Sequence, residues 1–194
     1  MKHLCLALIL LSSLVNLRAQ DVLQHHRNAS RDGLYIDPLI TRDSAPFLHR
    51  DLTFHAALPG PTYAQPLYVS NGPGGRAALI VATEQNLVLA IDAAGGDRLW
   101  TASLGNPVPL SSLPCGNIDP YGITGTPVID ADNRVIYLDA MTTPDGGTTK
   151  LHRIFALSLD DGSTLSGWPV ACPALLSREC PSTPAYRTSA ALCY

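Results

Sequence analysis

The chain contains the run Ala90-Ile91-Asp92-Ala93-Ala94-Gly95-Gly96-Asp97-Arg98-Leu99-Trp100. Residues 86–92, which lead into it, and residues 98–103, which lead out of it, are short runs rich in β-forming side chains. The residues between them include Ala94-Gly95-Gly96-Asp97, which favours a turn because glycine tolerates the positive φ of a tight reversal. The run therefore predicts two antiparallel strands joined by a tight turn.

Two further β-rich runs come before this pair. Residues 62–69 and 77–83 have the same short, largely apolar character, and the sequence between them includes Asn71-Gly72-Pro73-Gly74-Gly75. That cluster supplies both the positive φ and the stop that a reversal needs. The four runs together predict one four-stranded antiparallel meander.

The same order of runs begins again further along the chain. Residues 123–130, 134–141 and 151–159 are β-rich, and residues 164–170 form a weaker run. Residues 188–194 resemble the start of a third copy. A four-stranded unit that repeats predicts the blades of a propeller. The period of about sixty residues is set by three pairs: Pro66 with Pro127, Ala90 with Ala156, and Gly96 with Gly162.

The run at residues 90–100 resembles the repeat of pyrroloquinoline-quinone-type β-propellers, whose pattern is A-x-D-x-x-T-G-x-x-x-W. Ala90, Asp92, Gly96 and Trp100 match this pattern, while Gly95 replaces the usual threonine. The resemblance implies that the Asp and the Gly shape the turn between the third and fourth strands of a blade. It also implies that the Trp packs between neighbouring blades, so the motif is evidence for a fold rather than for a reaction.

The second copy departs from this pattern. Ala156 and Gly162 match it, but Ser158 stands in the Asp place and Ser166 in the Trp place. Trp168 follows two residues later. This departure weakens the expected docking contact, and the sequence leaves open whether Trp168 compensates through a bulge or a shifted strand.

The expected fold is all-β, an incomplete β-propeller of about two four-stranded antiparallel blades plus the start of a third. Because propellers typically close with about four to eight blades, the sequence favours the N-terminal part of a longer product over a chain that pairs with other copies. A small two-sheet sandwich is the alternative fold. The predicted organisation is a signal peptide at 1–19, an irregular lead-in at 20–61 and repeats over 62–194, with blades at 62–104, 123–170 and, in part, 188–194.

The N-terminus is typical of an export signal. Lys2 and His3 precede the apolar stretch Leu4–Val15, and Ala19 offers a small residue for cleavage. The stretch is too short to span a bilayer, so we expect an exported protein, periplasmic or extracellular, with no membrane span in the mature chain. The net charge of −3, with no run of Lys or Arg, argues against nucleic acid as a partner.

An oxidising compartment would allow the cysteines to pair. Four remain once the predicted signal is removed with Cys5, and they permit three pairings. Cys172 and Cys180 enclose a short segment and could form a disulfide across a small loop, leaving Cys115 and Cys193 to pair or stay free. Their spacing is not that of zinc ligands, so we predict a structural role and no metal site.

Two aspartates are the strongest candidates for a catalytic base or a metal ligand. Asp119 and Asp130 flank the glycine-containing segment 121–125. Such residues more often brace turns through Asx hydrogen bonds, which is the interpretation we favour. Ser111 and Ser112 lie in a predicted loop and are expected to be turn residues, since no oriented histidine is nearby in sequence.

The histidines of the lead-in raise the question of a metal site. His25 and His26 are adjacent, and His49 and His55 follow in the same segment. Neighbouring residues on a strand point to opposite sides, and no carboxylate or thiol completes a ligand set at a suitable spacing. We therefore expect a solvated lead-in without a metal.

These observations favour an exported propeller that binds a protein or a glycan through its loops, with no catalytic, cofactor-binding or metal residues. The alternative is part of a quinone-dependent alcohol or sugar dehydrogenase, which would use pyrroloquinoline quinone with calcium. Under that alternative, the cofactor residues would lie in further blades. A truncated remnant with open sheet edges is a third interpretation.

Overall fold

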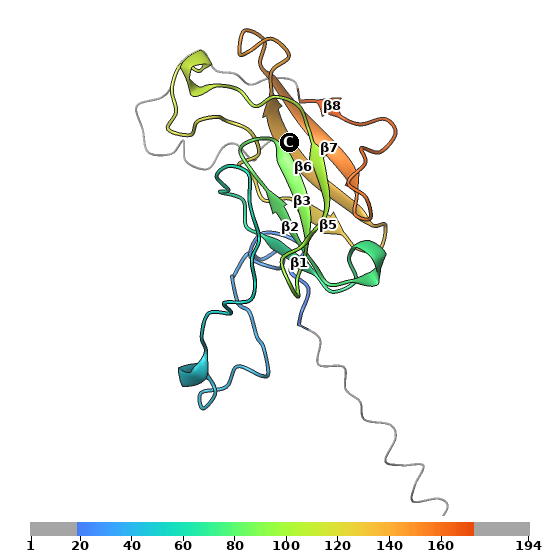
Figure 1. Ribbon diagram of the computed structural model, residues 1–194. Coiled ribbons are helices and arrows are strands. Elements are labelled where there is room, and N and C mark those ends of the chain that lie inside the picture. Colours follow the sequence, from blue (N-terminus) through green and yellow to red (C-terminus); the bar gives the residue numbers. More distant parts are fainter. Residues whose placement is uncertain (1–18, 173–194) are drawn as a thin grey trace, which may run out of the picture.

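The computed structural model describes residues 19–172, and it is all-β in this range (Figure 1). Across the described residues, two four-stranded antiparallel sheets contain every strand, and three short 3-10 helices lie between strands or in the lead-in: η1 Ala45–Phe47, η2 Pro73–Gly75 and η3 Leu110–Ser112. The first sheet consists of β1 Leu67–Val69, β2 Ala78–Ala82, β3 Leu87–Asp92 and β4 Arg98–Ser103. The second consists of β5 Val128–Asp130, β6 Val135–Thr142, β7 Leu151–Ser158 and β8 Val170–Ala171.

Both sheets are meanders in which each strand pairs with the next one along the chain. The structure thus confirms the prediction of an all-β chain with two successive four-stranded antiparallel units. The predicted signal, apart from its last residue Ala19, and the predicted start of a third unit at 188–194 lie outside the described residues. Within residues 19–172, no helix is long and apolar enough to cross a membrane.

The fourth strand of the second unit differs from the prediction. The sequence predicted a run at 164–170, but Thr164 makes only an isolated bridge with Leu157, and pairing resumes at Val170 opposite Ile154. Between these points the chain turns away from β7, with Gly167 at a φ of 86°. Pro169 has no N–H to donate to a ladder, which explains why the strand is interrupted here.

Trp168 lies within this interruption, and the structure shows where its side chain packs. Its ring contacts Tyr137 edge to face, with the ring centroids 5.9 Å apart. It therefore lies against a strand of its own sheet.

The turns that follow β3 and β7 have the same hydrogen bonds. The N–H of Gly96 donates to the carbonyl of Asp92 at 2.9 Å, and that of Gly162 donates to the carbonyl of Ser158 at 2.9 Å. The Asp92 carboxylate also accepts from the backbone N–H two residues on, and the Ser158 hydroxyl accepts in the same way. Serine thus replaces aspartate in the second unit without loss of the turn.

Each sheet has two faces, and the strand registers show which face of the first sheet is equivalent to which face of the second. Ile80 lies opposite Ala90 in the first sheet as Tyr137 lies opposite Ala156 in the second, and we call this side the front face. Val81 lies opposite Leu89 as Leu138 lies opposite Phe155, and we call this side the back face. Side chains alternate between the two faces along each strand.

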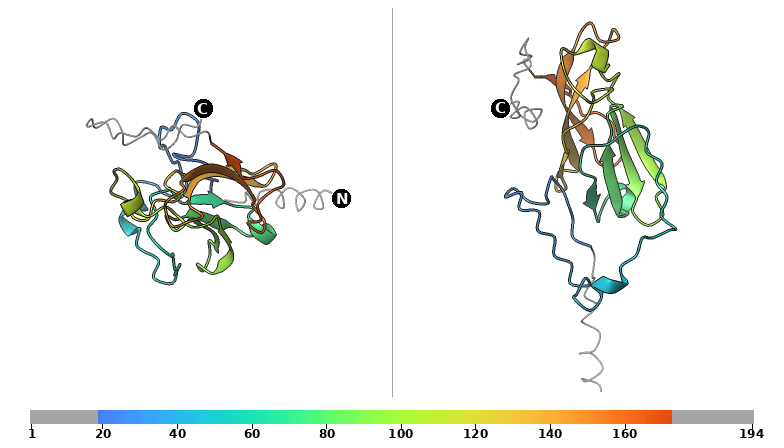
Figure 2. Two further views of the ribbon diagram at one scale, coloured as in Figure 1. Left: turned by 90° about the horizontal axis from the view of Figure 1, so that it is seen from above. Right: turned by 90° about the vertical axis from the view of Figure 1, so that its left-hand side faces the viewer.

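The two sheets are stacked on each other (Figure 2). The front face of the first sheet packs against the back face of the second. One buried cluster combines front-face residues of the first sheet, such as Leu67 and Ile80, with back-face residues of the second, such as Leu138 and Phe155. The remaining back face, that of the first sheet, is covered by Phe54 and Ala56 of the lead-in, which pack against Val81, Leu89 and Ile91.

Trp100 fastens the two sheets together at one end. Its indole Nε1–H donates to the carbonyl of Leu159 at 3.1 Å, so the side chain of β4 reaches the turn after β7. A Cβ added at Gly162 would lie 2.7 Å from the indole ring. The turn glycine therefore provides both a φ of 72° and the space in which the ring lies.

The start of the lead-in joins the two sheets a second time. Val22 and Tyr68 exchange both backbone hydrogen bonds, at 2.8 and 3.1 Å. The carbonyl of Leu23 accepts from the N–H of Ile129 at 2.8 Å. Residues 21–23 thus lie along β1 and β5, the first strand of each sheet.

The two tryptophans provide a test of this packing. We expect Trp100→Ala to lower the free energy of unfolding by about 3 kcal/mol, as for other large aromatic side chains removed from a packed contact. Trp168→Ala, the matched control, removes the same side chain from one sheet and should cost clearly less. Urea unfolding of both variants measures the difference, and equal losses would contradict the assigned role of Trp100.

Candidate functional site

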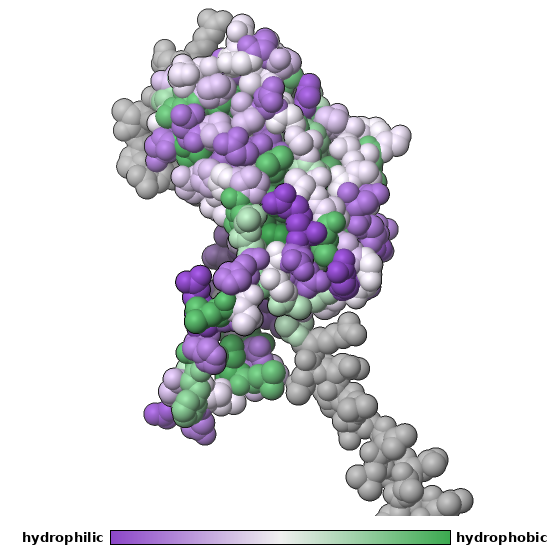
Figure 3. All heavy atoms as spheres, in the orientation of Figure 1, coloured by the Kyte–Doolittle hydropathy of each residue, from purple (hydrophilic) through white to green (hydrophobic). Residues whose placement is uncertain are grey.

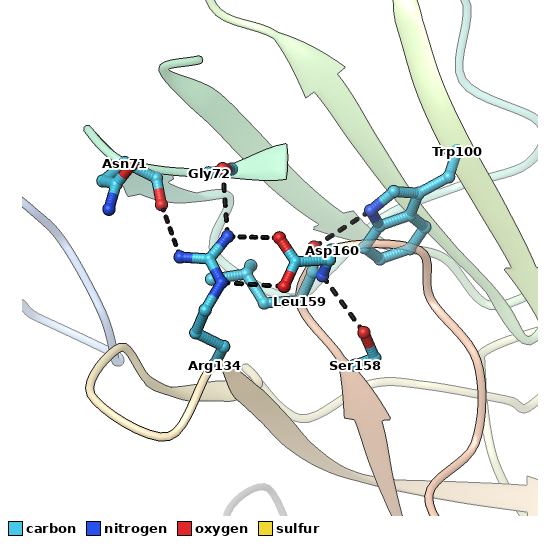
Figure 4. A network of polar contacts seen from close by, with 7 residues as sticks. All are labelled: Asn71, Gly72, Trp100, Arg134, Ser158, Leu159 and Asp160. Carbon is cyan, nitrogen blue, oxygen red and sulfur yellow. Dashed lines mark hydrogen bonds and ion pairs between the residues drawn. The ribbon is translucent and has the colours of Figure 1, made fainter. Parts of the chain in front are cut away.

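The side chain of Arg134 ties together three turns at the end of the sheets near Trp100 (Figure 4). Its Nε donates to the Asp160 carboxylate at 2.8 Å, and one terminal nitrogen makes a second, short contact with the same carboxylate. The terminal nitrogens also donate to the carbonyls of Asn71 and Gly72 at 3.0 and 3.1 Å. The guanidinium thus links the β5–β6 and β7–β8 turns to the β1–β2 turn of the other sheet.

This network is a brace rather than an open cation site. The hydrogen bonds from Arg134 lower the pKa of Asp160, and those to Asp160 raise the pKa of Arg134. Both side chains keep part of their surface in water, so the pair itself contributes little to stability. Its geometric role is larger, because one bidentate group fixes the relative position of both sheets.

The other end of the sheets contains a buried carboxylate. Glu84 follows β2 and is fully buried. One of its oxygens accepts from the Gly122 N–H at 2.7 Å, and the other accepts from the Thr124 hydroxyl at 2.8 Å. Burial raises the pKa of Glu84, and these two hydrogen bonds lower it in part. The carboxylate binds the segment that leads from β4 into β5.

Further polar groups surround this carboxylate. Asn86 donates to the carbonyl of Met141 at 2.7 Å, and, in the part of the chain described, its buried Oδ1 accepts no hydrogen bond. Burial also raises the pKa of Tyr121, and the nearby carboxylates of Asp139 and Glu84 raise it further. We call Glu84, Asn86, Tyr121, Gly122 and Thr124 the carboxylate junction.

Sequence reasoning did not single out Glu84 or Asn86. Glu84 stands between two predicted β-rich runs and Asn86 is the first residue of the second run, where polar residues are ordinary turn formers. Their partners Gly122 and Met141 lie in the other half of the chain. Only the packing of the two units reveals that these turn residues are buried.

The two aspartates singled out from the sequence brace turns. Asp130 accepts from both the backbone N–H and the side-chain amide of Asn133, at 3.0 and 2.8 Å, which lowers the pKa of Asp130. Asp119 accepts from the N–H of Leu110 at 3.0 Å. None of these three hydrogen bonds involves a residue of the carboxylate junction, although Tyr121, Gly122 and Thr124 of the junction lie between the two aspartates in sequence.

The prediction that His25 and His26 point apart is wrong. Their rings stack with centroids 4.0 Å apart, because His26 has a φ of 54° and the chain turns here instead of continuing as a strand. Burial is the main cause that lowers the pKa of His25, and the nearby positive charges of His26 and Arg31 add to it. Among residues 19–172, no three His, Cys, Asp or Glu side chains form a group that could hold a metal.

The structure tests the predicted pairing of the cysteines only in part. Neither Cys115 nor Cys172 is a free thiol in the structure. Cys180, the predicted partner of Cys172, lies outside the described residues, so this pairing stays a prediction.

Two loops meet at the end of the sheets that contains the carboxylate junction. The long connection between β4 and β5 contacts the β6–β7 connection through a hydrogen bond from the Thr143 N–H to the Asn106 carbonyl, at 2.9 Å. Ser112 also lies close to Gly147. We call residues 104–127 and 143–150 the loop face, and its exposed polar residues are Asn106, Ser111, Asn117, Asp119, Asp145, Thr148 and Thr149.

Comparison with known proteins assigns the chain to no family. No protein-family model matches it, and no curated protein matches it significantly. The resemblance carried by residues 90–100 therefore remains a prediction.

The raised pKa of Glu84 predicts a pH dependence. An acid whose pKa is higher in the folded state contributes stability that is complete below its ordinary pKa and is lost as the pH rises through the folded value. The free energy of unfolding should therefore fall with rising pH in this window, and Glu84→Gln should remove that part of the slope. Urea unfolding from acid to neutral pH tests this, and identical slopes would contradict it.

The close approach at Gly122 provides a second test. A Cβ added there would lie 2.2 Å from the Glu84 carbonyl oxygen and 2.6 Å from Asn86 Oδ1. We expect Gly122→Ala to destabilise the fold by about 1–3 kcal/mol, as overpacking does elsewhere. Gly95→Ala is the matched control, because the nearest atom there is 4.0 Å away. Thermal unfolding that ranks the two variants equally would argue against the junction geometry.

Proposed function

We propose that the two sheets are consecutive blades of an exported β-propeller of the quinoprotein-like repeat class. In this proposal the protein is a non-catalytic scaffold, and it binds a protein or a glycan through the loop face. The observation that carries the proposal is the front-to-back packing of two equivalent units.

Front-to-back packing supports a propeller over an isolated sandwich. A sandwich has apolar inner faces and polar outer faces on both sheets. Here each sheet has apolar side chains on its outer face as well. The lead-in covers those of the first sheet, and among residues 19–172 those of the second sheet include the part-exposed Val128, Tyr137 and Val170.

A comparison of equivalent positions shows how the exposure of this face differs between the two sheets. Val128 on the second sheet is equivalent to Leu67 on the first, and Tyr137 is equivalent to Ile80. Leu67 and Ile80 are both 0 % exposed, whereas Val128 is 46 % and Tyr137 37 % exposed. A further unit packed in the same way would cover these side chains, as expected for the next blade.

The loop face supports binding as the role of this scaffold. Its loops are held by paired strands and by the carboxylate junction, and rigid sheets that carry long loops commonly use those loops for recognition. Asn117, Thr148 and Thr149 offer amide and hydroxyl groups at the surface. Both oxygens of Glu84 already accept hydrogen bonds, so the exposed loops are the better place for a ligand.

Binding to glycan and peptide arrays tests the proposal. We expect saturable binding of at least one ligand class and a loss of about ten-fold or more in the double variant Asn117→Ala, Thr148→Ala, since a few contacts dominate most interfaces. Asp132→Ala, an exposed change in the β5–β6 turn, is the control and should bind normally. Binding that ignores the loop variant, or turnover of an alcohol or sugar with added quinone and calcium, would refute the scaffold proposal.

A further inference from the structure

The surface of the two sheets is mixed in polarity. Figure 3 shows hydrophilic and hydrophobic residues side by side over the body of the molecule. A mixed surface argues against a broad apolar contact on the side in view and favours recognition at smaller places. One such smaller place is a hollow beside the turn after β3.

The hollow lies where the lead-in returns to the first sheet (Figure 1). Its volume is about 280 Å³, close to the about 300 Å³ at the lower end of ordinary small-molecule pockets. This size suits a molecule as small as an amino acid. The lining residues are His55 and Ala57 of the lead-in and Ile91, Gly96, Asp97 and Arg98 of the first sheet.

Close backbone contacts hold the walls of the hollow together. The His55 N–H donates to the Gly95 carbonyl at 3.4 Å, and a Cβ added at Gly96 would lie 2.2 Å from the His55 carbonyl oxygen. The turn glycine is therefore what allows the lead-in to lie against the sheet here. Ile91 is 2 % exposed, so it gives the hollow a buried apolar wall.

The polar side chains around the hollow have few partners within the protein. Among residues 19–172, the Asp97 carboxylate and the His55 ring make no hydrogen bond or ion pair. The Arg98 guanidinium makes one long hydrogen bond, to the Ala57 carbonyl at 3.4 Å, so most of its donors are open to a ligand. Polar groups that surround a hollow without internal partners are typical of a binding site.

The charges of these side chains define the ligand. The guanidinium of Arg98 is a donor fork that fits a carboxylate, and the His55 ring can supply a further hydrogen bond. Asp97 has the opposite charge and fits an ammonium group. A molecule that carries both charges close together, beside an apolar group for Ile91 and Ala57, matches this set. Those are the features of a free α-amino acid with an apolar side chain.

We propose that this hollow binds a free α-amino acid with an apolar side chain, with the carboxylate on Arg98 and the ammonium group on Asp97. Consecutive turns of a meander alternate between its two ends, so the turn after β3 lies at the opposite end from Glu84 and the loop face. The site is therefore separate from the loop face. It goes beyond the scaffold function and does not depend on it.

Titration of the full chain with leucine, followed by NMR of the backbone amides, tests the proposal. We expect saturable shifts at Gly96 and Arg98 at millimolar leucine. Arg98→Gln and Asp97→Asn should each weaken binding by about ten-fold or more, because each variant removes one of the two charged partners. Arg42→Gln, a change of an exposed arginine elsewhere in the lead-in, is the matched control and should bind leucine as the wild type does.

Blocked ligands test the two charges of the amino acid separately. N-acetyl-leucine lacks the ammonium group and leucine methyl ester lacks the carboxylate, so each should bind about ten-fold or more weakly than leucine. Ala57→Phe fills the hollow and should abolish binding, and its thermal unfolding shows that the variant is folded.

Three results would each overturn the proposal: no saturable shift with leucine, equal binding by a blocked ligand, or unchanged binding in Arg98→Gln. The loop variant Asn117→Ala, Thr148→Ala should keep its affinity for leucine, whether or not the loop face binds a protein or a glycan. A loss of leucine binding in that variant would place the leucine site on the loop face and so contradict the proposal as well.

Discussion

The contact between the Trp100 indole and the turn glycine Gly162 is the constraint on which the two-sheet arrangement depends. It requires a large ring on one unit and the absence of a Cβ on the next. The turn after β3 meets a related constraint, since a Cβ at Gly96 would lie 2.2 Å from the carbonyl oxygen of His55 in the lead-in. In each unit the turn glycine leaves space for another part of the chain: the lead-in packs at Gly96, and Trp100 packs at Gly162. Front-to-back stacking follows from these contacts.

Much of the fold could be predicted from local signals. Turn residues such as Gly96 and Gly162, and the apolar runs beside them, depend on chemistry within a few positions, and they placed most of the strands. The predictions failed where the chain departs from the regular strand that its neighbouring residues suggest. Pro169 interrupts the last strand of the second unit, and a left-handed φ at His26 brings together two rings that an extended chain would separate.

The carboxylate junction could not be predicted for a related reason. Glu84 looks like a turn residue, and only its partners Gly122 and Thr124 make it a buried brace. The two ends of the sheets are therefore held by different chemistry. At one end the partly hydrated guanidinium of Arg134 links three turns, and at the other the desolvated carboxylate of Glu84 binds the segment that leads from β4 into β5. The loops that reach the surface extend from the second end.

The pairing of residues 21–23 with both sheets bears on how the chain folds. Val22 meets Tyr68, and Leu23 meets Ile129, so the first described residues contact strands from both halves of the sequence. On a ribosome, the start of the chain emerges well before β5 exists. Such a contact has a large sequence separation, and contacts of this kind slow folding because a long loop must close first. The amino-terminal segment is therefore expected to dock late, after both meanders have formed.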